Sequence, residues 1–182
     1  GIYSLEKGRT FYTANSGLLE LRRELCKYFE RKYKVSYDYN SEVLVTVGGS
    51  EAIDLMIRCI IEDGDEVLIP EPCFVCYKPC TELSRGVPVS IETKEEDNFR
   101  LTAEQLRSKI TDKTKLLILP FPNNPTGAVM SQKDLEEIAE VLRGTDIMVL
   151  SDEIYAELRY DDEGHTTFSA IDGMKERTVV VN

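Results

Sequence analysis

Four short segments of the sequence carry residues whose types and spacing could bind a ligand. The first runs from Val47 to Ile53 (VGGSEAI) and joins an apolar stretch to a predicted helix through two glycines. Glycine lets the backbone come close to a ligand, and the start of a helix offers N–H groups and the positive end of its dipole. Gly49, Ser50 and Glu51 could therefore bind a phosphate, or they could simply cap a helix.

The second segment, Pro72 to Tyr77 (PCFVCY), directly follows another apolar stretch. An aromatic side chain at the end of a strand can stack on a flat heteroaromatic ring, and Phe74 is the candidate for this role. The alternative is that Phe74 and Tyr77 are ordinary core residues.

The third segment, Phe121 to Gly127 (FPNNPTG), also follows an apolar stretch. Because proline restricts the residue before it to extended backbone, Asn124 is expected to be held rigidly. A rigid asparagine could present its amide to a phenolic oxygen. The same residue types also make plain turns.

The fourth segment, Ser151 to Tyr155 (SDEIY), ends a further apolar stretch. A carboxylate at this position costs desolvation unless it meets a cation. A protonated pyridine nitrogen is such a cation, and its pairing with Asp152 would make the ring an electron sink. The alternatives are a carboxylate that caps a loop or binds a metal.

The elements that must position these segments alternate between helix and strand. Apolar periodicity predicts helices over residues 17–34, 50–62, 72–85, 102–110 and 131–143. Short apolar runs predict strands over residues 43–47, 66–70, 87–91, 115–120, 147–150 and 178–181. This order predicts a three-layer α/β/α fold around a mostly parallel sheet of about six strands. Ligands of such sheets bind beyond the carboxyl ends of the strands, where all four segments are expected.

Composition excludes several classes of partner. The 22 Lys and Arg residues against 33 Asp and Glu give a net charge of −11, and no basic block is present, so we expect no nucleic-acid partner. No apolar run approaches the length needed to span a bilayer, so we expect no membrane partner. Five cysteines are present: Cys26, Cys59, Cys73, Cys76 and Cys80. They lack paired ligand spacing and His165 is remote, so we expect no metal site and reduced thiols in a cytoplasmic protein.

Taken in order, the four segments resemble the fold-type-I, class I/II pyridoxal-phosphate (PLP) aminotransferases of the aspartate aminotransferase superfamily. The resemblance runs from about Tyr12 to Asn182. It implies a PLP cofactor, amino acid and 2-oxo acid substrates, and a homodimer. It also implies a role for each matching residue: Gly49, Ser50 and Glu51 at the phosphate, Phe74 stacked on the pyridine ring, Asn124 and Tyr155 at the ring 3-oxygen, Asp152 at the pyridine nitrogen, and Tyr12 at the phosphate of the partner subunit.

The same resemblance implies that part of the enzyme lies outside these residues. Residues 1–16 match a lead-in segment and residues 17–182 a partial PLP-binding large domain, whereas the small domain and the N-terminal arm are not matched. The Schiff-base lysine is expected just after the last predicted strand, so we expect this chain alone to be inactive. Lys175 precedes that strand and should lie at the opposite end of the sheet.

Other functions remain open. The same cradle serves C–S β-lyases and aminocyclopropane-carboxylate synthases, whose outcome depends on substrate contacts. A non-catalytic PLP-fold binding module is a further alternative, although no helix-turn-helix accompanies this sequence. A nucleotide-binding domain is disfavoured because the glycine fingerprint of such domains is missing.

Overall fold

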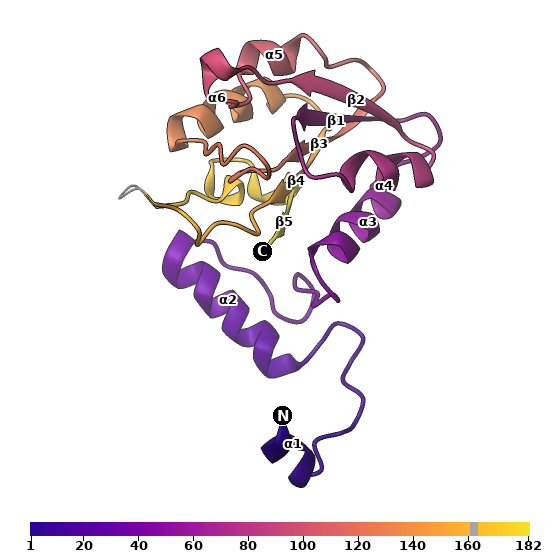
Figure 1. Cartoon of the computed structure of the whole chain (residues 1–182), viewed down its shortest axis with the longest axis vertical. Coiled ribbons are helices and arrows are strands. Elements are labelled where there is room, and N and C mark those ends of the chain that lie inside the picture. Colours follow the sequence, from indigo (N-terminus) through magenta and orange to yellow (C-terminus); the bar gives the residue numbers. More distant parts are fainter. Residues whose placement is uncertain (161–163) are drawn as a thin grey trace. The chain divides into compact units, whose positions relative to one another are not determined.

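The computed structural model describes residues 1–160 and 164–182, which divide into two compact units, Gly1–Val47 and Gly48–Asn182 (Figure 1). The first unit contains α1 (Ile2–Glu6) and α2 (Leu19–Tyr33). Helix α2 buries Phe29, whose ring centre lies 5.3 Å from that of Tyr33 and 5.6 Å from that of Tyr37. This aromatic cluster is the core of the first unit.

The predicted strand over residues 43–47 is wrong. Val45 N donates to Ser16 O, in the chain before α2, at 3.1 Å, and among the described residues the segment belongs to no strand. Val47 is 96% exposed, so its apolar side chain is not buried in a sheet. The backbone at residue 17 lies so close to Val45 that only glycine fits there, because a Cβ on Gly17 would lie 2.5 Å from the Cβ of Val45.

The second unit alternates helices and strands as the sequence predicts. In chain order its main elements are α3 (Gly49–Ile60), β1 (Glu66–Glu71), α4 (Tyr77–Leu83), β2 (Val87–Glu92), α5 (Ala103–Arg107), β3 (Thr114–Leu119), α6 (Gln132–Leu142), β4 (Met148–Asp152) and β5 (Thr178–Val181). The five strands form one all-parallel sheet in the order β2-β1-β3-β4-β5. The predicted α/β class with a parallel sheet is thus confirmed, with five strands in this sheet.

Helices cover both faces of this sheet (Figure 1). On one face, Leu117 and Val149 of the strands pack with Leu135 and Ile138 of α6 and with the neighbouring α5. On the other face, alternate strand residues such as Ile118 pack with α3 and with the start of α4. Because successive strand side chains point to opposite faces, adjacent residues feed two separate cores, which gives the three predicted layers.

Local sequence explains where several helices begin and end. Thr102 and Ser131 form capping boxes with Gln105 and Asp134, so α5 and α6 begin where the sequence predicts. The helix predicted over 72–85 is shorter, because residues 72–76 form the loop that leaves the sheet and Arg85, at φ +64°, turns the chain toward β2. Over the described residues, no helix is both long and apolar enough to cross a membrane.

Candidate functional site

A cavity of about 180 Å³ lies at the carboxyl ends of the central strands of the second unit. The segments that follow β1, β3 and β4 meet there with the start of α3. The lining residues are Gly49, Ser50, Ile53, Phe74, Tyr77, Pro120, Pro122, Asn124, Asp152, Ile154 and Tyr155. The ligand-binding end of a parallel sheet is therefore hollow where the sequence segments converge.

Six of the eight candidate residues line this cavity: Gly49, Ser50, Phe74, Asn124, Asp152 and Tyr155. Glu51 has an exposed side chain on the first turn of α3 and is not among the lining residues. Tyr12 belongs to the first unit, where its side chain is fully exposed. Lys175 lies in a 3-10 turn immediately before β5, at the amino ends of the parallel strands.

The start of α3 lines the cavity with Gly49 and Ser50, which carry no charged side chain. Its N-cap is Gly48, at φ +134°, a conformation that L side chains rarely adopt. As a glycine, this N-cap residue has no side chain to cap the helix end. The first turn of an α-helix leaves N–H groups that its own carbonyls cannot bind, and the helix dipole makes this end favourable for an anion.

The turn after β3 is held together by Asn123, which is buried at 7% exposure. Its Oδ1 accepts hydrogen bonds from the Thr126 backbone N–H at 3.2 Å and the Thr126 hydroxyl at 2.9 Å. The Thr126 hydroxyl in turn accepts from the N–H of Ala128 at 3.1 Å. The turn presents the neighbouring Asn124, whose Nδ2 donates to the Tyr155 hydroxyl at 3.5 Å. Both candidate partners of a phenolic oxygen therefore lie together.

Asp152 is the last residue of β4 and is 6% exposed. Its Oδ2 accepts from the Tyr77 hydroxyl at 2.7 Å, and its Oδ1 accepts from the Ile154 N–H at 3.3 Å. Burial raises the pKa of this carboxyl, while both hydrogen bonds act in the opposite direction. Among the described residues, no lysine, arginine or histidine forms an ion pair with Asp152.

The sequence suggested Tyr77 only as a core residue, and it is indeed buried, but its spacing of three residues from Phe74 also indicates a place in the site. Tyr77 opens α4 and its ring meets that of Phe74 edge-on, with centres 6.1 Å apart and planes at 83°. One tyrosine thus contacts both the candidate stacking residue and the candidate carboxylate.

Sequence reasoning also missed a buried polar network centred on Glu153, which is 1% exposed. Its Oε1 accepts from the hydroxyls of Ser151 and Thr167 at 2.8 and 2.9 Å, and from the Phe168 N–H at 3.1 Å. Its Oε2 lies 2.8 Å from His165 Nε2. The network connects the end of β4 to residues 165–168. It therefore holds in place the segment that contains Asp152 and Tyr155.

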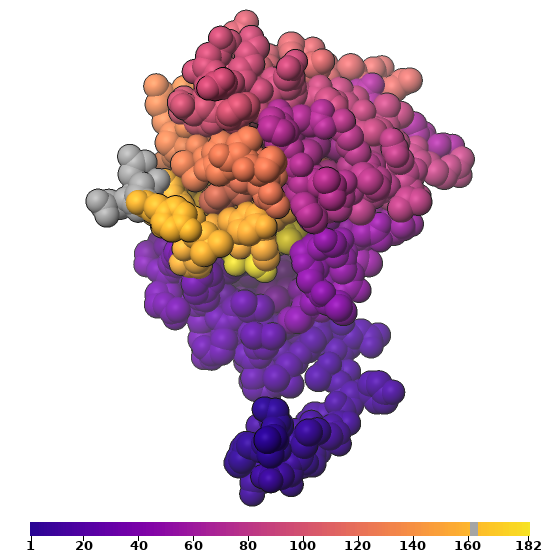
Figure 2. Space-filling model, viewed as in Figure 1, coloured from indigo at the N-terminus to yellow at the C-terminus, as the bar shows by residue number. Residues whose placement is uncertain are grey.

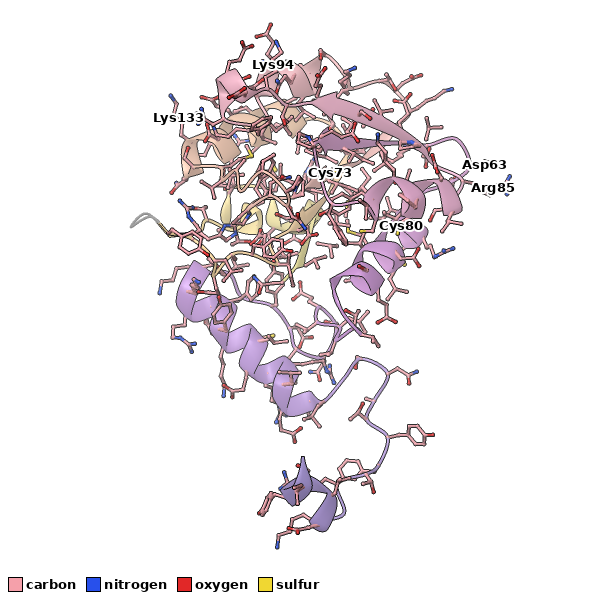
Figure 3. The ribbon with its side chains drawn as sticks, in the orientation of Figure 1. Asp63, Cys73, Cys80, Arg85, Lys94 and Lys133 are labelled. Carbon is pink, nitrogen blue, oxygen red and sulfur yellow. The ribbon has the colours of Figure 1, made fainter. Side chains whose placement is uncertain are left out.

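The cysteines are all free thiols. Burial raises the pKa of Cys73 to about 11 and that of Cys76 to about 12, so both are protonated at neutral pH. Cys73 and Cys80 lie on the α4 side of the sheet, whereas the pair formed by Asp63 and Arg85 joins the loops before β1 and β2 (Figure 3). The described residues contain no group of three or more His, Cys, Asp or Glu that could hold a metal ion.

The surface beside the cavity is formed by the segments that follow β3 and β4, which lie next to each other (Figure 2). Leu158 and Tyr160 are exposed there, at 58% and 99%. This rim combines apolar side chains with the polar Asn124 and Arg159.

Comparison with known proteins gives one consistent result. The sequence model of the family described as aminotransferase class I and II matches residues 4–182. The chain is 48% identical to the Bacillus subtilis (strain 168) protein YugH, over 100% of the chain and 47% of that protein. It is 43% identical to an aspartate aminotransferase of Pyrococcus abyssi, over 98% of the chain and 46% of that protein.

Solved structures agree. An aromatic aminotransferase from Pyrococcus horikoshii OT3 superimposes with a TM-score of 0.95 at 43% identity, over 98% of this chain and 48% of that one. A Thermus thermophilus aspartate aminotransferase with maleate gives a TM-score of 0.92 at 36% identity, over 98% of this chain and 46% of that one. The chain thus spans about half the length of the relatives it matches.

Proposed function

The chain belongs to the class I and II aminotransferase family, and from this premise we propose that it forms the cofactor-binding part of a PLP-dependent aminotransferase that moves an amino group between an amino acid and a 2-oxo acid. One observation carries the proposal: the cavity contains a buried carboxylate, Asp152, that forms no ion pair within the described structure. A buried carboxylate is costly without a cation, and the protonated pyridine nitrogen of PLP would supply one.

The residues that line the cavity fit PLP group by group. The start of α3, with Gly49 and Ser50, offers N–H groups and a hydroxyl to a phosphate. Phe74 offers a ring face for stacking. Asn124 and Tyr155 are hydrogen-bonded to each other and together suit the ring 3-oxygen. The role of Glu51 is confined to its backbone N–H, because its side chain is exposed.

The chemistry of the reaction divides between cofactor and protein. When bound, PLP supplies an electron sink for the α-carbon of the amino acid. Asp152 keeps a proton on the pyridine nitrogen by accepting its hydrogen bond. Asn124 donates to the 3-oxygen, and the Tyr155 hydroxyl binds the same atom. Phe74 and the residues beside it exclude water from one face of the ring.

Two further parts of the proposal concern residues beyond the cavity. Residues 1–16 are a lead-in segment and residues 17–182 a partial large domain. We place Tyr12 at the phosphate of a partner subunit in a homodimer, a role that its full exposure within the first unit leaves it free to take. The lysine that would bind PLP covalently is assigned to the segment following β5.

The test is PLP binding by the protein produced at the full length its gene encodes. Apoprotein is titrated with PLP and bound cofactor is measured by absorbance after dialysis. Asp152→Ala removes the pyridinium partner and is expected to weaken binding by about 100-fold, the loss typical of a desolvated charge-assisted contact. Asp112→Ala removes an exposed carboxylate and is the matched control.

A second measurement records the absorbance spectrum of the bound cofactor in each variant after amino acids are added. Transfer of an amino group to the cofactor changes this spectrum. A wild-type protein that binds no PLP, or that binds it equally well without Asp152, would contradict the proposal.

A further inference from the structure

Tyr77 connects two parts of the cavity that are far apart in the sequence. It opens α4, and its side chain is 2% exposed. Its hydroxyl donates to Asp152 Oδ2 at 2.7 Å, across 75 residues of sequence. This bond joins the segment after β1 to the end of β4.

Among the described residues, this bond is the shorter of two that hold the Asp152 carboxylate. The other, from the Ile154 N–H to Oδ1, is 3.3 Å long and comes from the same loop as Asp152. Within the part of the chain that the structure describes, the Tyr77 bond is thus the one that ties this carboxylate to a different element. Both donors are neutral, so neither replaces a cation at this position.

The surroundings of Tyr77 keep its hydroxyl a donor. Burial, followed by the nearby charge of Asp152, raises the pKa of Tyr77 far above its ordinary value. The ring is fixed by its edge contact with Phe74, so the direction of the O–H is set by packing.

We propose that Tyr77 is a positioning residue, which holds the Asp152 carboxylate in place for the pyridine nitrogen of the cofactor. The inference rests on the proposed function. It extends that function, because the affinity for the cofactor would then depend on Tyr77 of α4, whose hydroxyl acts through Asp152. The competing explanation is that the hydroxyl only satisfies its own burial, in which case its removal would cost stability but not cofactor affinity.

Tyr77→Phe separates these explanations, because it keeps the ring and its contact with Phe74 and removes only the hydroxyl. The protein is produced at the full length its gene encodes, and PLP affinity is measured by titrating apoprotein. We expect about tenfold weaker binding, the scale of one hydrogen bond to a charged group. Tyr33→Phe makes the same change at a buried tyrosine of α2 and is the matched control, expected within about twofold of wild type.

A double-mutant cycle shows whether the hydroxyl acts through Asp152. In an Asp152→Asn background, Tyr77→Phe is expected to change PLP affinity by less than about twofold, because the charge it supports is gone. A direct readout is the ¹⁵N NMR shift of the pyridine nitrogen of bound labelled PLP. In Tyr77→Phe the shift is expected to move toward the unprotonated value, because the carboxylate becomes the stronger base. Circular dichroism confirms that each variant is folded.

Three results overturn the inference. Binding by Tyr77→Phe within about twofold of wild type would show that the hydroxyl is not needed. An equal loss in the Asp152→Asn background would show that it acts independently of the carboxylate. An unchanged ¹⁵N shift would show that the carboxylate does not sense it. Failure of the wild-type protein to bind PLP would instead overturn the proposed function itself, and Tyr77 with it.

Discussion

Replacing Glu153 by alanine should destabilise the second unit severely. The side chain accepts three hydrogen bonds on Oε1 and contacts His165 through Oε2, all in a buried environment. Removal leaves four buried polar groups without this partner. At about 1 kcal/mol for each, the free energy of unfolding should fall by about 4 kcal/mol. For a protein of this size that corresponds to a melting temperature lower by about 8–16 °C.

Glu153→Gln provides a graded comparison. It keeps an oxygen in the Oε1 position, with its three donors, and replaces Oε2 by an amide NH₂ opposite His165. The expected loss is about 1 kcal/mol, a quarter of that for alanine. Glu82→Ala removes an exposed carboxylate from α4 and should change stability by no more than about 0.5 kcal/mol.

The assay is urea unfolding followed by far-ultraviolet circular dichroism, with a common slope fitted to all variants. Equal losses of stability in Glu153→Ala and Glu153→Gln would show that the three bonds to Oε1 contribute nothing. Unfolding of Glu153→Ala at the urea concentration of the wild type would show that the network does not stabilise the fold.

Two further predictions concern single side chains. Burial raises the pKa of Asp152 in the folded, cofactor-free protein above 3.8, the reference value for the unfolded chain. The folded protein therefore binds the proton of this carboxyl more tightly than the unfolded chain does. At pH values where the carboxyl is ionised, its buried charge destabilises the fold. Asp152→Asn should therefore raise the melting temperature of the cofactor-free protein near neutral pH. The difference in melting temperature between variant and wild type should decrease as the pH falls toward 3.8, and a constant difference would contradict this. Ser131 caps α6 by accepting from the Asp134 N–H at 3.2 Å, so Ser131→Ala should cost about 1 kcal/mol in urea unfolding, and an unchanged midpoint would count against the cap.

The sequence predicts the second unit well because each of its helices and strands carries its own local signal. The stripe of α3, the capping boxes of α5 and α6 and the apolar runs of β1, β3 and β4 act over a few residues. The failure at residues 43–47 has the opposite cause. An apolar run indicates that burial is favourable, but it does not say whether a neighbouring strand is available to pair with it.

The candidate site divides in the same way. Segments at strand ends are brought together by the parallel sheet, so Phe74, Asn124 and Asp152 could be located from their positions alone. Glu51 could not be placed, because which side of the first turn of α3 faces the cavity depends on where that helix begins. The contacts of Tyr77 with Asp152 and of His165 with Glu153 could not be predicted, because these partners are determined by packing across the fold.

The strand order β2-β1-β3-β4-β5 also has a consequence for assembly on the ribosome. Once β1 and β2 have paired, β3, β4 and β5 add on the β1 side of this pair in the order of synthesis. Of the five described strands, none is inserted between two that are already joined. The cavity is therefore built in chain order: the start of α3 comes first, then the segment of Phe74, then that of Asn124, and last that of Asp152. Its walls are complete only when β4 has docked, so a nascent chain released before that point would lack a binding site.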